Sequence, residues 1–269
     1  PTFSVYAINY SKLNLKVYSV TPADWPQFGQ FIREWRQTDQ PPAMPGKLIS
    51  DGEIELDIPD DTLSQVDIDL SKYMKGESGH FIVVVEPPVG LFENDEAKWR
   101  RESQTIISWV QVTQIGLDAF NDHSEVVAWT TDLKDGKPLA GVRIQPDTGG
   151  EAVVSGKDGT VHFDIPDGAS YLVATKGNDS AILPHSNYYY FWSNDTWYSD
   201  PPKDSLVWYV FDDRQIYRPG EEVHIKGWIR RLGNGQGGDV ALMGADLASV
   251  SYQITEPQGN TLTERQVNV

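Results

Sequence analysis

Residues 212–230 carry the sequence Asp-Asp-Arg-Gln-Ile-Tyr-Arg-Pro-Gly-Glu-Glu-Val-His-Ile-Lys-Gly-Trp-Ile-Arg, which decides how the rest of the chain is interpreted. Pro219 fixes its own φ at a value that suits a turn, and Gly220 tolerates a positive φ. Beyond the turn, Val223 and Ile225 alternate with polar neighbours, as the residues of a half-buried strand do. The stretch therefore predicts a strand, a tight turn and a second strand, which is how many β domains begin.

Similar strand patterns, separated by turn residues, recur along the whole chain. This arrangement is typical of immunoglobulin-like β-sandwich modules, and 269 residues exceed what one hydrophobic core usually serves. The predicted fold is therefore all-β, with tandem antiparallel β-sandwich domains. Strands are expected within residues 2–20 on either side of a turn at 9–11, and at 79–85, 106–113, 126–133, 160–165, 171–175 and 206–211.

Three domains follow from this spacing. The first sandwich takes residues 1–113 and contains a short helical insertion, and the second takes residues 114–205. The third begins at residue 206 and is incomplete, because the remaining residues, about 60, are too few for a sandwich of about 100. The chain begins and stops inside strand-like sequence, so we expect a fragment of a longer protein.

One helix is expected in the first domain. Five apolar residues fall near helical spacing, and their stripe should pack against the edge of the sandwich; they are Trp25, Phe28, Phe31, Ile32 and Trp35. Residues 39–45 contain three prolines and should form a loop.

Two motifs in this order resemble a known family. The string from Asp213 to Gly220 closely resembles the start of a domain in the alpha-2-macroglobulin family, where an Asp-Arg pair leads into Tyr-Arg-Pro-Gly and a strand. In bacterial members the preceding domain has a Gly-Lys-Pro-Leu/Val-Ala-Gly turn, an Asp-Gly turn and a Leu-Val-Ala strand. Here those places are taken by residues 136–141, 158–159 and 172–174. The resemblance implies macroglobulin-type domains, with a structural hallmark made by Asp213, Arg214, Tyr217, Arg218, Pro219 and Gly220.

Composition excludes several classes of function. Acidic residues outnumber basic ones by 39 to 22, and the net charge of −17 disfavours binding to nucleic acid. The absence of cysteine excludes disulfides, thiolate zinc sites and cysteine nucleophiles from this segment. No apolar run approaches the roughly 20 residues that span a bilayer, so no membrane span is expected in this segment.

The sequence offers no catalytic or metal-binding pattern. None of the five histidines stands at ligand spacing from a partner, so each is expected to be structural or exposed; they are His80, His123, His162, His185 and His224. No Gly-x-Ser-x-Gly motif is present, and the glycine-rich residues 232–239 favour a loop over a phosphate cradle. We therefore expect a protein that is not an enzyme and has no cofactor and no metal.

Acidic residues gather at several positions. They are expected to be solvated on strand faces and turns rather than to bind calcium, because the EF-hand pattern is absent; the first group is Asp57, Asp60, Asp61, Asp67 and Asp69. A carboxylate of Asp212 or Asp213 is expected to pair with Arg214 or Arg218 and fix the hallmark turn.

Aromatic residues are concentrated between residues 188 and 198, where seven of eleven positions are aromatic. Such a cluster suits packing between the second and third domains, and it would also suit stacking on sugars or a protein partner. The interface reading is preferred, with Tyr188, Tyr190, Trp192 and Trp197 as its residues.

The resemblance implies a function for the longer protein. It implies a scaffold fragment of a bacterial alpha-2-macroglobulin-like, broad-spectrum protease inhibitor that traps proteases after cleavage of a bait region. Endopeptidase inhibition would then serve bacterial defence in the periplasm or at the cell surface, with bait, any thioester and any lipid anchor outside this chain. Expected partners are proteases, through the intact protein, and neighbouring macroglobulin domains. The alternatives are a surface adhesin or glycan-binding sandwich repeat that uses residues 188–198, and an accessory module of a secreted enzyme.

Overall fold

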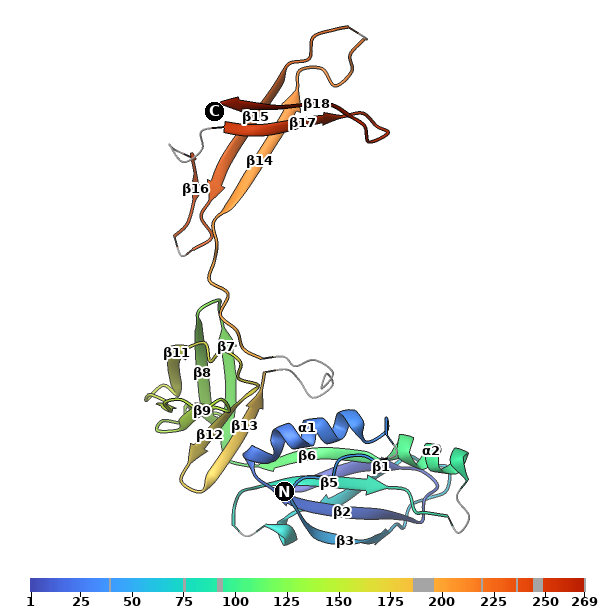
Figure 1. The fold of residues 1–269 in the computed structure, drawn as a ribbon. Coiled ribbons are helices and arrows are strands. Elements are labelled where there is room, and N and C mark those ends of the chain that lie inside the picture. The colour runs from blue at the N-terminus through green and yellow to red at the C-terminus, as the bar shows by residue number, and fades with distance from the viewer. Residues whose placement is uncertain are drawn as a thin grey trace. The chain divides into compact units, whose positions relative to one another are not determined.

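A computed structural model describes residues 1–38, 40–74, 76–90, 94–185, 196–218, 220–235, 237–243 and 249–268 of the chain. The chain divides into two compact units, Pro1–Ser199 and Asp200–Val269 (Figure 1). Antiparallel strands dominate both units, so the predicted all-β class is confirmed. The predicted domain boundaries after residues 113 and 205 stay predictions.

The first sandwich consists of two sheets. One has the order β3 (Lys47–Glu55), β2 (Lys12–Val20), β5 (Gly79–Glu86) and β6 (Ile106–Val112), and the other pairs β1 (Thr2–Ala7) with β4 (Ser64–Asp69). Inward-facing residues of both sheets, such as Val5, Leu15 and Val83, form a common buried core. Asn9 has a φ of 58°, which lets the chain turn between β1 and β2 although the two strands join different sheets.

Strand β5 is buried on both faces. Phe81, Val83 and Val85 face the sandwich core, whereas Ile82 and Val84 point to the outer face of the sheet. This outer face has to be covered because nearly every residue of β5 is apolar. The cover includes helix α1 (Trp25–Glu34), which follows the short 3₁₀ turn Pro22–Asp24 and lies beside β6 in Figure 1.

The predicted helix is therefore confirmed, but its predicted place is wrong. The rings of Trp25 and Phe28 lie 5.3 and 5.6 Å from the ring of Trp109 on β6, so the apolar stripe packs on the outer face of the sheet and not on its edge. The reason is that β5 and β6 present apolar side chains on that face, which offer more area to bury than an edge does.

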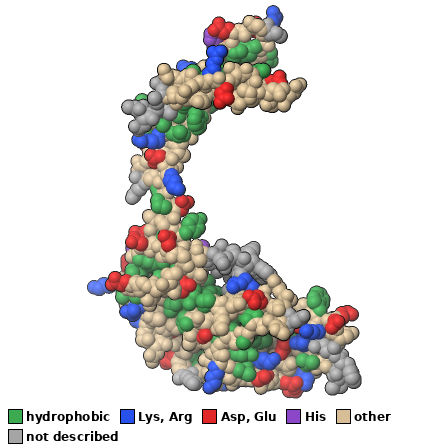
Figure 2. All heavy atoms as spheres, viewed as in Figure 1, with side chains coloured by type: hydrophobic (Ala, Val, Ile, Leu, Met, Phe, Trp, Pro, Cys, Tyr) green, Lys and Arg blue, Asp and Glu red, His purple; other side chains and the backbone are tan. Residues whose placement is uncertain are grey.

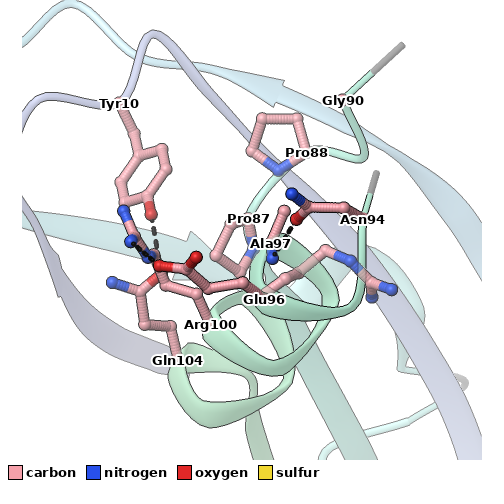
Figure 3. Close-up of a pocket in the computed structure, with 10 residues that line it drawn as sticks. Tyr10, Pro87, Pro88, Gly90, Asn94, Glu96, Ala97, Arg100 and Gln104 are labelled. Atoms are coloured by element: carbon pink, nitrogen blue, oxygen red, sulfur yellow. Dashed lines mark hydrogen bonds and ion pairs between the residues drawn. The ribbon is translucent and has the colours of Figure 1, made fainter. Parts of the chain in front are cut away.

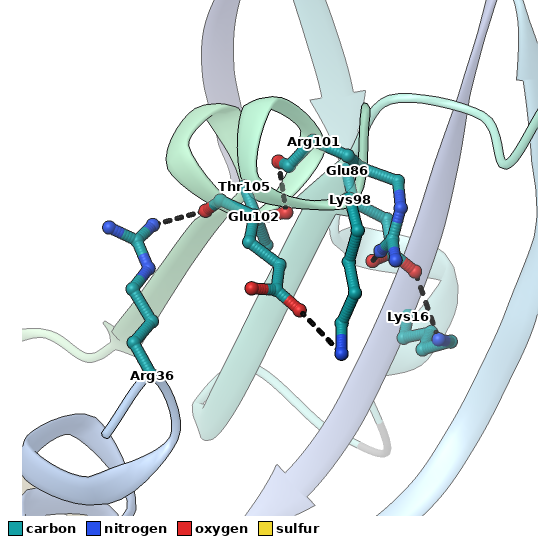
Figure 4. A network of polar contacts seen from close by, with 7 residues as sticks. All are labelled: Lys16, Arg36, Glu86, Lys98, Arg101, Glu102 and Thr105. Carbon is teal, nitrogen blue, oxygen red and sulfur yellow. Dashed lines mark hydrogen bonds and ion pairs between the residues drawn. The ribbon is translucent and has the colours of Figure 1, made fainter. Parts of the chain in front are cut away.

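A second helix, α2 (Asp95–Gln104), has no apolar stripe, which is why the sequence pattern did not predict it. Its first turn is capped by the side chain of Asn94, which accepts a hydrogen bond from the backbone N–H of Ala97 at 2.8 Å. An ion pair joins the helix to the sheet: Arg101 lies 3.2 Å from Glu86 on β5, which also pairs with Lys16 on β2 at 3.0 Å (Figure 4). A second 3₁₀ turn covers Ser71–Tyr73.

The second sandwich also has two sheets. The three-stranded one has the order β11 (Thr160–Asp164), β8 (Glu125–Asp132) and β7 (Ile115–Asn121). The four-stranded one has the order β10 (Val153–Val154), β9 (Arg143–Pro146), β12 (Tyr171–Lys176) and β13 (Asp179–Pro184), so that β13 is an edge strand. The strands predicted at 126–133, 160–165 and 171–175 are confirmed, whereas β13 was not predicted.

The second unit contains two separate antiparallel ribbons. In one, β14 (Ser205–Asp212) pairs with β15 (Ile225–Leu232), which pairs with the short β16 (Val240–Ala241). In the other, β17 (Ser249–Thr255) pairs with β18 (Thr261–Asn268). The strand after the hallmark turn begins at Ile225, two residues later than the alternation from Val223 predicts. None of the described residues in this unit is buried.

Candidate functional site

The contact between the two sandwiches is the most elaborate site that the described residues form. A hydrophobic cluster, here called the joint core, combines residues of both sandwiches; it contains Val20, Trp25, Phe28, Ile82 and Val84 from the first and Tyr171 and Ile182 from the second. Phe28 belongs to this cluster and has 0% of its surface exposed. Because the two sandwiches share this apolar core, separating them would expose it to water.

Polar contacts also join the sandwiches along the edge strand β13. The side-chain amide of Gln111 on β6 accepts a hydrogen bond from the backbone N–H of Ile182 at 2.9 Å and donates one to the carbonyl of the same residue at 3.2 Å. A strand placed beside β13 would satisfy the same two groups with its own backbone. The glutamine therefore caps an open sheet edge, which otherwise invites pairing with another strand.

Two further side chains of this contact lie near the start of β13. The imidazole Nε2 of His80 lies 3.1 Å from the carbonyl oxygen and 2.9 Å from the hydroxyl of Ser180. The carboxylate of Asp179 accepts a hydrogen bond at 2.8 Å from the backbone N–H of Gln114, which lies in the link between β6 of the first sandwich and β7 of the second. We call these contacts of His80, Gln111 and Gln114 the β13 edge contacts.

His80 stands apart electrostatically. The residue has 6% of its surface exposed. Burial lowers the pKa of its imidazole, although the hydrogen bond to Ser180 and the charge of Asp179 act in the opposite direction. The other four histidines are exposed. Within the described ranges, no group of three or more histidine, aspartate or glutamate side chains is arranged to hold a metal ion.

The hallmark loop between β14 and β15 is closed by its own side chains. The phenol of Tyr217 donates a hydrogen bond to the carboxylate of Asp213, and the guanidinium Nε of Arg214 lies 3.3 Å from the same carboxylate. The Arg214 guanidinium also lies over the Tyr217 ring, 5.2 Å from its centre. Asp213 and Arg214 are thus paired, as the sequence predicted.

The second half of this loop turns at glycine. Gly220 has a φ of +87°, a conformation that other residues adopt only with strain. The backbone N–H of Arg218 is bound by the side chain of Glu221 at 3.0 Å, while Pro219 lies outside the described residues. These contacts order the turn. Their role as a structural hallmark stays a prediction.

The pKa values of Asp213 and Tyr217 in the loop are shifted in opposite directions. The hydrogen bond from Tyr217 holds the pKa of Asp213 below its ordinary value, because it stabilises the carboxylate. Partial desolvation, together with the bond to Asp213, raises the pKa of Tyr217.

The two glycine-containing turns of the second sandwich meet at one buried hydroxyl that the sequence did not single out. Thr130 is fully buried on β8, and its Oγ1 lies 2.7 Å from the carbonyl oxygen of Leu139 and 3.0 Å from that of Gly159. Gly159 has a φ of +79°, and a Cβ there would lie 2.4 Å from the Thr130 carbonyl oxygen. The turns at residues 136–141 and 158–159 are therefore parts of one structural corner.

The predicted aromatic interface is described at only one of its four residues. Tyr188, Tyr190 and Trp192 lie outside the described residues. Trp197 has 4% of its surface exposed and belongs to the core of the second sandwich, where its backbone N–H binds the carbonyl of Ala169 at 2.9 Å. Trp197 therefore packs within one sandwich.

A shallow cleft of about 350 Å³ lies between α2 and the turn after β1 (Figure 3). The phenol of Tyr10 donates a hydrogen bond to Gln104 at 2.8 Å, and Arg100 pairs with Glu96 at 3.1 Å along the helix. The described residues that line it include no serine, cysteine or histidine.

Comparison with solved structures finds proteins that have the same architecture. The structure of trypsin-activated alpha-2-macroglobulin from Escherichia coli aligns with 99% of this chain at a TM-score of 0.53 and 19% identity. The fold is that of bacterial alpha-2-macroglobulin domains. A Salmonella alpha-2-macroglobulin reacted with methylamine matches 99% of the chain at a TM-score of 0.51 and 18% identity. The E. coli NIE-MG1 domain structure matches 68% of this chain and 87% of its own length, at a TM-score of 0.51 and 20% identity.

The chain spans a small part of its longer relatives. The alignments take in 18% of the trypsin-activated E. coli structure and 15% of the Salmonella structure. A curated relative, circularly permutated Ras protein 2 of Dictyostelium discoideum, is 22% identical over 283 residues, which cover 86% of this chain and 7% of that protein. No protein-family model matches the chain.

Proposed function

We propose that this chain is a non-catalytic scaffold segment of a longer, bacterial alpha-2-macroglobulin-like protease inhibitor. The observation that carries the proposal is the alignment of nearly the whole chain, 99%, with a trypsin-activated alpha-2-macroglobulin. The two sequence motifs that resemble the family, at residues 136–141 and 213–220, support it independently. In this proposal the longer protein traps proteases of broad specificity after they cleave a bait region.

The chemistry of trapping lies outside this chain in our proposal. The chain has no cysteine, so it cannot supply the cysteine of a thioester. Its contribution is a rigid frame, supported by the joint core and the β13 edge contacts. The chain itself is proposed not to be an enzyme.

The second unit supports a role in contacts with further macroglobulin domains of the same longer protein. Hydrophobic side chains reach the surface there (Figure 2), and on β14 Trp208, Tyr209 and Val210 are 56%, 61% and 63% exposed. Exposed apolar strands of this kind mark interaction surfaces. Neighbouring domains and, through the intact protein, proteases are the proposed partners.

The proposed location is the periplasm or the cell surface, where an inhibitor would meet foreign proteases and serve in bacterial defence. None of the described helices has the length and apolar character to span a membrane. In our proposal, any lipid anchor belongs to a region outside this chain.

The glycan-binding alternative is not favoured. It requires the aromatic residues at 188–198 to present their rings to solvent. Of the two described aromatic residues in this range, Trp197 is buried in the second sandwich and Tyr198 is 68% exposed, so these two rings do not form a shared stacking surface.

An inhibition assay with two substrates tests the proposal. A trapped protease should lose activity on a large protein substrate, which cannot reach it, and keep activity on a small peptide substrate, which can. We expect this pattern for the longer protein and no inhibition by the isolated 269-residue chain. Equal loss on both substrates, or inhibition by the isolated chain, would contradict a scaffold role.

A further inference from the structure

His80 is the one buried histidine among the five in the chain, all of which the structure describes. It begins the run of buried residues on β5 and lies between the two sandwiches, with its ring 5.9 Å from that of Trp109. Its hydrogen-bond partner, Ser180, is on the edge strand β13 of the other sandwich. A change in the charge of this ring therefore acts directly on the contact between the sandwiches.

The hydrogen-bond partners of the ring favour one protonation state. The Ser180 carbonyl can only accept a hydrogen bond and the Ser180 hydroxyl can also accept one, so we assign to Nε2 of His80 a proton that it donates to Ser180. The other nitrogen, Nδ1, is buried and has no hydrogen-bond partner among the described residues. The contact is therefore built for the neutral imidazole with its proton on Nε2.

We propose that His80 makes the contact between the two sandwiches sensitive to acid. A proton added at Nδ1 would place a positive charge and an unsatisfied N–H donor inside the contact. Burying either one without a partner is unfavourable. Acid would therefore weaken the β13 edge contacts and favour separation of β13 from β5 and β6.

Several charged or titratable groups lie on the elements packed around His80. On β13, Asp179 attracts a protonated ring, and its Oδ1 is buried without a partner, but desolvation of His80 outweighs this attraction. On β12, the amine of Lys176 binds the carbonyl of Ala140, and burial raises the pKa of the Tyr171 phenol, which stays neutral. On the 3₁₀ turn before α1, Asp24 accepts hydrogen bonds from Thr21. The β6 neighbours Trp109 and Gln111 carry no charge.

The direction of the pH dependence follows from linkage. Burial lowers the pKa of His80 from its ordinary value of 6.5, so the separated state binds a proton more readily than the joined state does. The stability of the contact is complete above that ordinary value and is lost as the pH falls from it toward the lowered pKa. Between about pH 7.5 and about pH 5.5, opening should increase by up to about tenfold.

Hydrogen exchange of the whole chain measures this opening. The backbone N–H of Ile182, which binds Gln111, should lose up to about tenfold in protection factor between the two pH values, after correction for intrinsic exchange. Amides paired between β2 and β3 serve as an internal reference. In His80→Gln, whose side chain stays neutral and can still donate a hydrogen bond, the loss should disappear. The matched control His162→Gln, at an exposed histidine, should keep it.

Two results would overturn the inference. One is an equal pH dependence of Ile182 protection in the unmodified chain and in His80→Gln. The other is an NMR titration of His80 in the unmodified chain with a pKa at or above its ordinary value of 6.5. This titration decides the question if His80→Gln fails to fold. Neither measurement depends on the proposed inhibitor function.

Discussion

Replacement of Phe28 by alanine tests whether the joint core holds the two sandwiches together. Phe28 is completely buried, with its ring 5.8 Å from Trp25 and 5.6 Å from Trp109. Truncation of a buried phenylalanine costs about 3–5 kcal/mol through lost burial and the cavity left behind. Because Phe28 is fully buried, the whole of this cost is expected. We expect the free energy of unfolding of the first unit to fall by this amount.

The assay is urea unfolding followed by near-ultraviolet circular dichroism, to which Trp25 and Trp109 beside the cavity contribute. A thermal scan should show a parallel decrease of roughly 6–20 °C in Tm, from about 2–4 °C per kcal/mol. The matched control is Phe120→Ala, because Phe120 is 60% exposed on β7 and its loss should cost less than about 0.5 kcal/mol.

Two outcomes would refute the reasoning behind Phe28→Ala. A cost below about 1 kcal/mol would mean that the residue is not fully packed. Separate unfolding transitions for the two sandwiches of the unmodified chain would mean that the joint core does not couple them.

Three further substitutions have definite expected results. Thr130→Val keeps the side-chain volume but removes the hydroxyl shared by two turns, so it should lower the free energy of unfolding by about 1–3 kcal/mol in urea. Gln111→Ala leaves both backbone groups of Ile182 without their side-chain partner, so the free energy of unfolding should fall by about 1–2 kcal/mol and the Ile182 amide should exchange faster. The fall stays this small because Gln111 is exposed and water can replace its side chain. Tyr217→Phe removes the phenol that stabilises the carboxylate of Asp213, so an NMR titration should show the pKa of Asp213 move up toward its ordinary value of 3.8. Since the Asp213 pKa is lowered in the folded loop, its contribution to loop stability is present above this value and is lost as the pH falls below it.

Matched controls separate these effects from general damage. Thr131→Val changes the neighbouring threonine on the opposite face of β8, and Gln37→Ala removes an exposed glutamine away from β13. Tyr209→Phe removes a phenol from the same unit without touching the hallmark loop. Each prediction fails if its control gives the same change.

The sequence predicted the elements whose signal is local. The apolar run from Phe81 to Val85 predicts a buried strand, and the spacing of Trp25 and Phe28 predicts a helix. The place where that helix packs depends on Tyr171 and Ile182, which lie about 150 residues away along the chain, so no local pattern reveals it. Trp197 illustrates the reverse problem: its dense aromatic neighbourhood suggested an interface, whereas its backbone and ring are fixed within one sandwich.

The polar contacts between the sandwiches were missed for a related reason. His80 and Gln111 meet partners at positions 180 and 182, and a single polar residue in a strand carries no mark of a distant partner. The available signal was the position of His80 directly before an apolar run, which is where a buried polar residue needs a specific hydrogen bond. Helix α2 was missed because caps and ion pairs stabilise it, and apolar periodicity cannot detect those.

Complex formation by the longer protein tests the central claim most directly. The longer protein is incubated with an active serine protease or with the same protease blocked at its catalytic serine, and complexes are separated by size-exclusion chromatography. The first cleavage site is mapped by mass spectrometry. A scaffold role predicts that only the active protease is retained and that the first cut falls outside residues 1–269. Retention of both forms or of neither, or a first cut inside these residues, would contradict it.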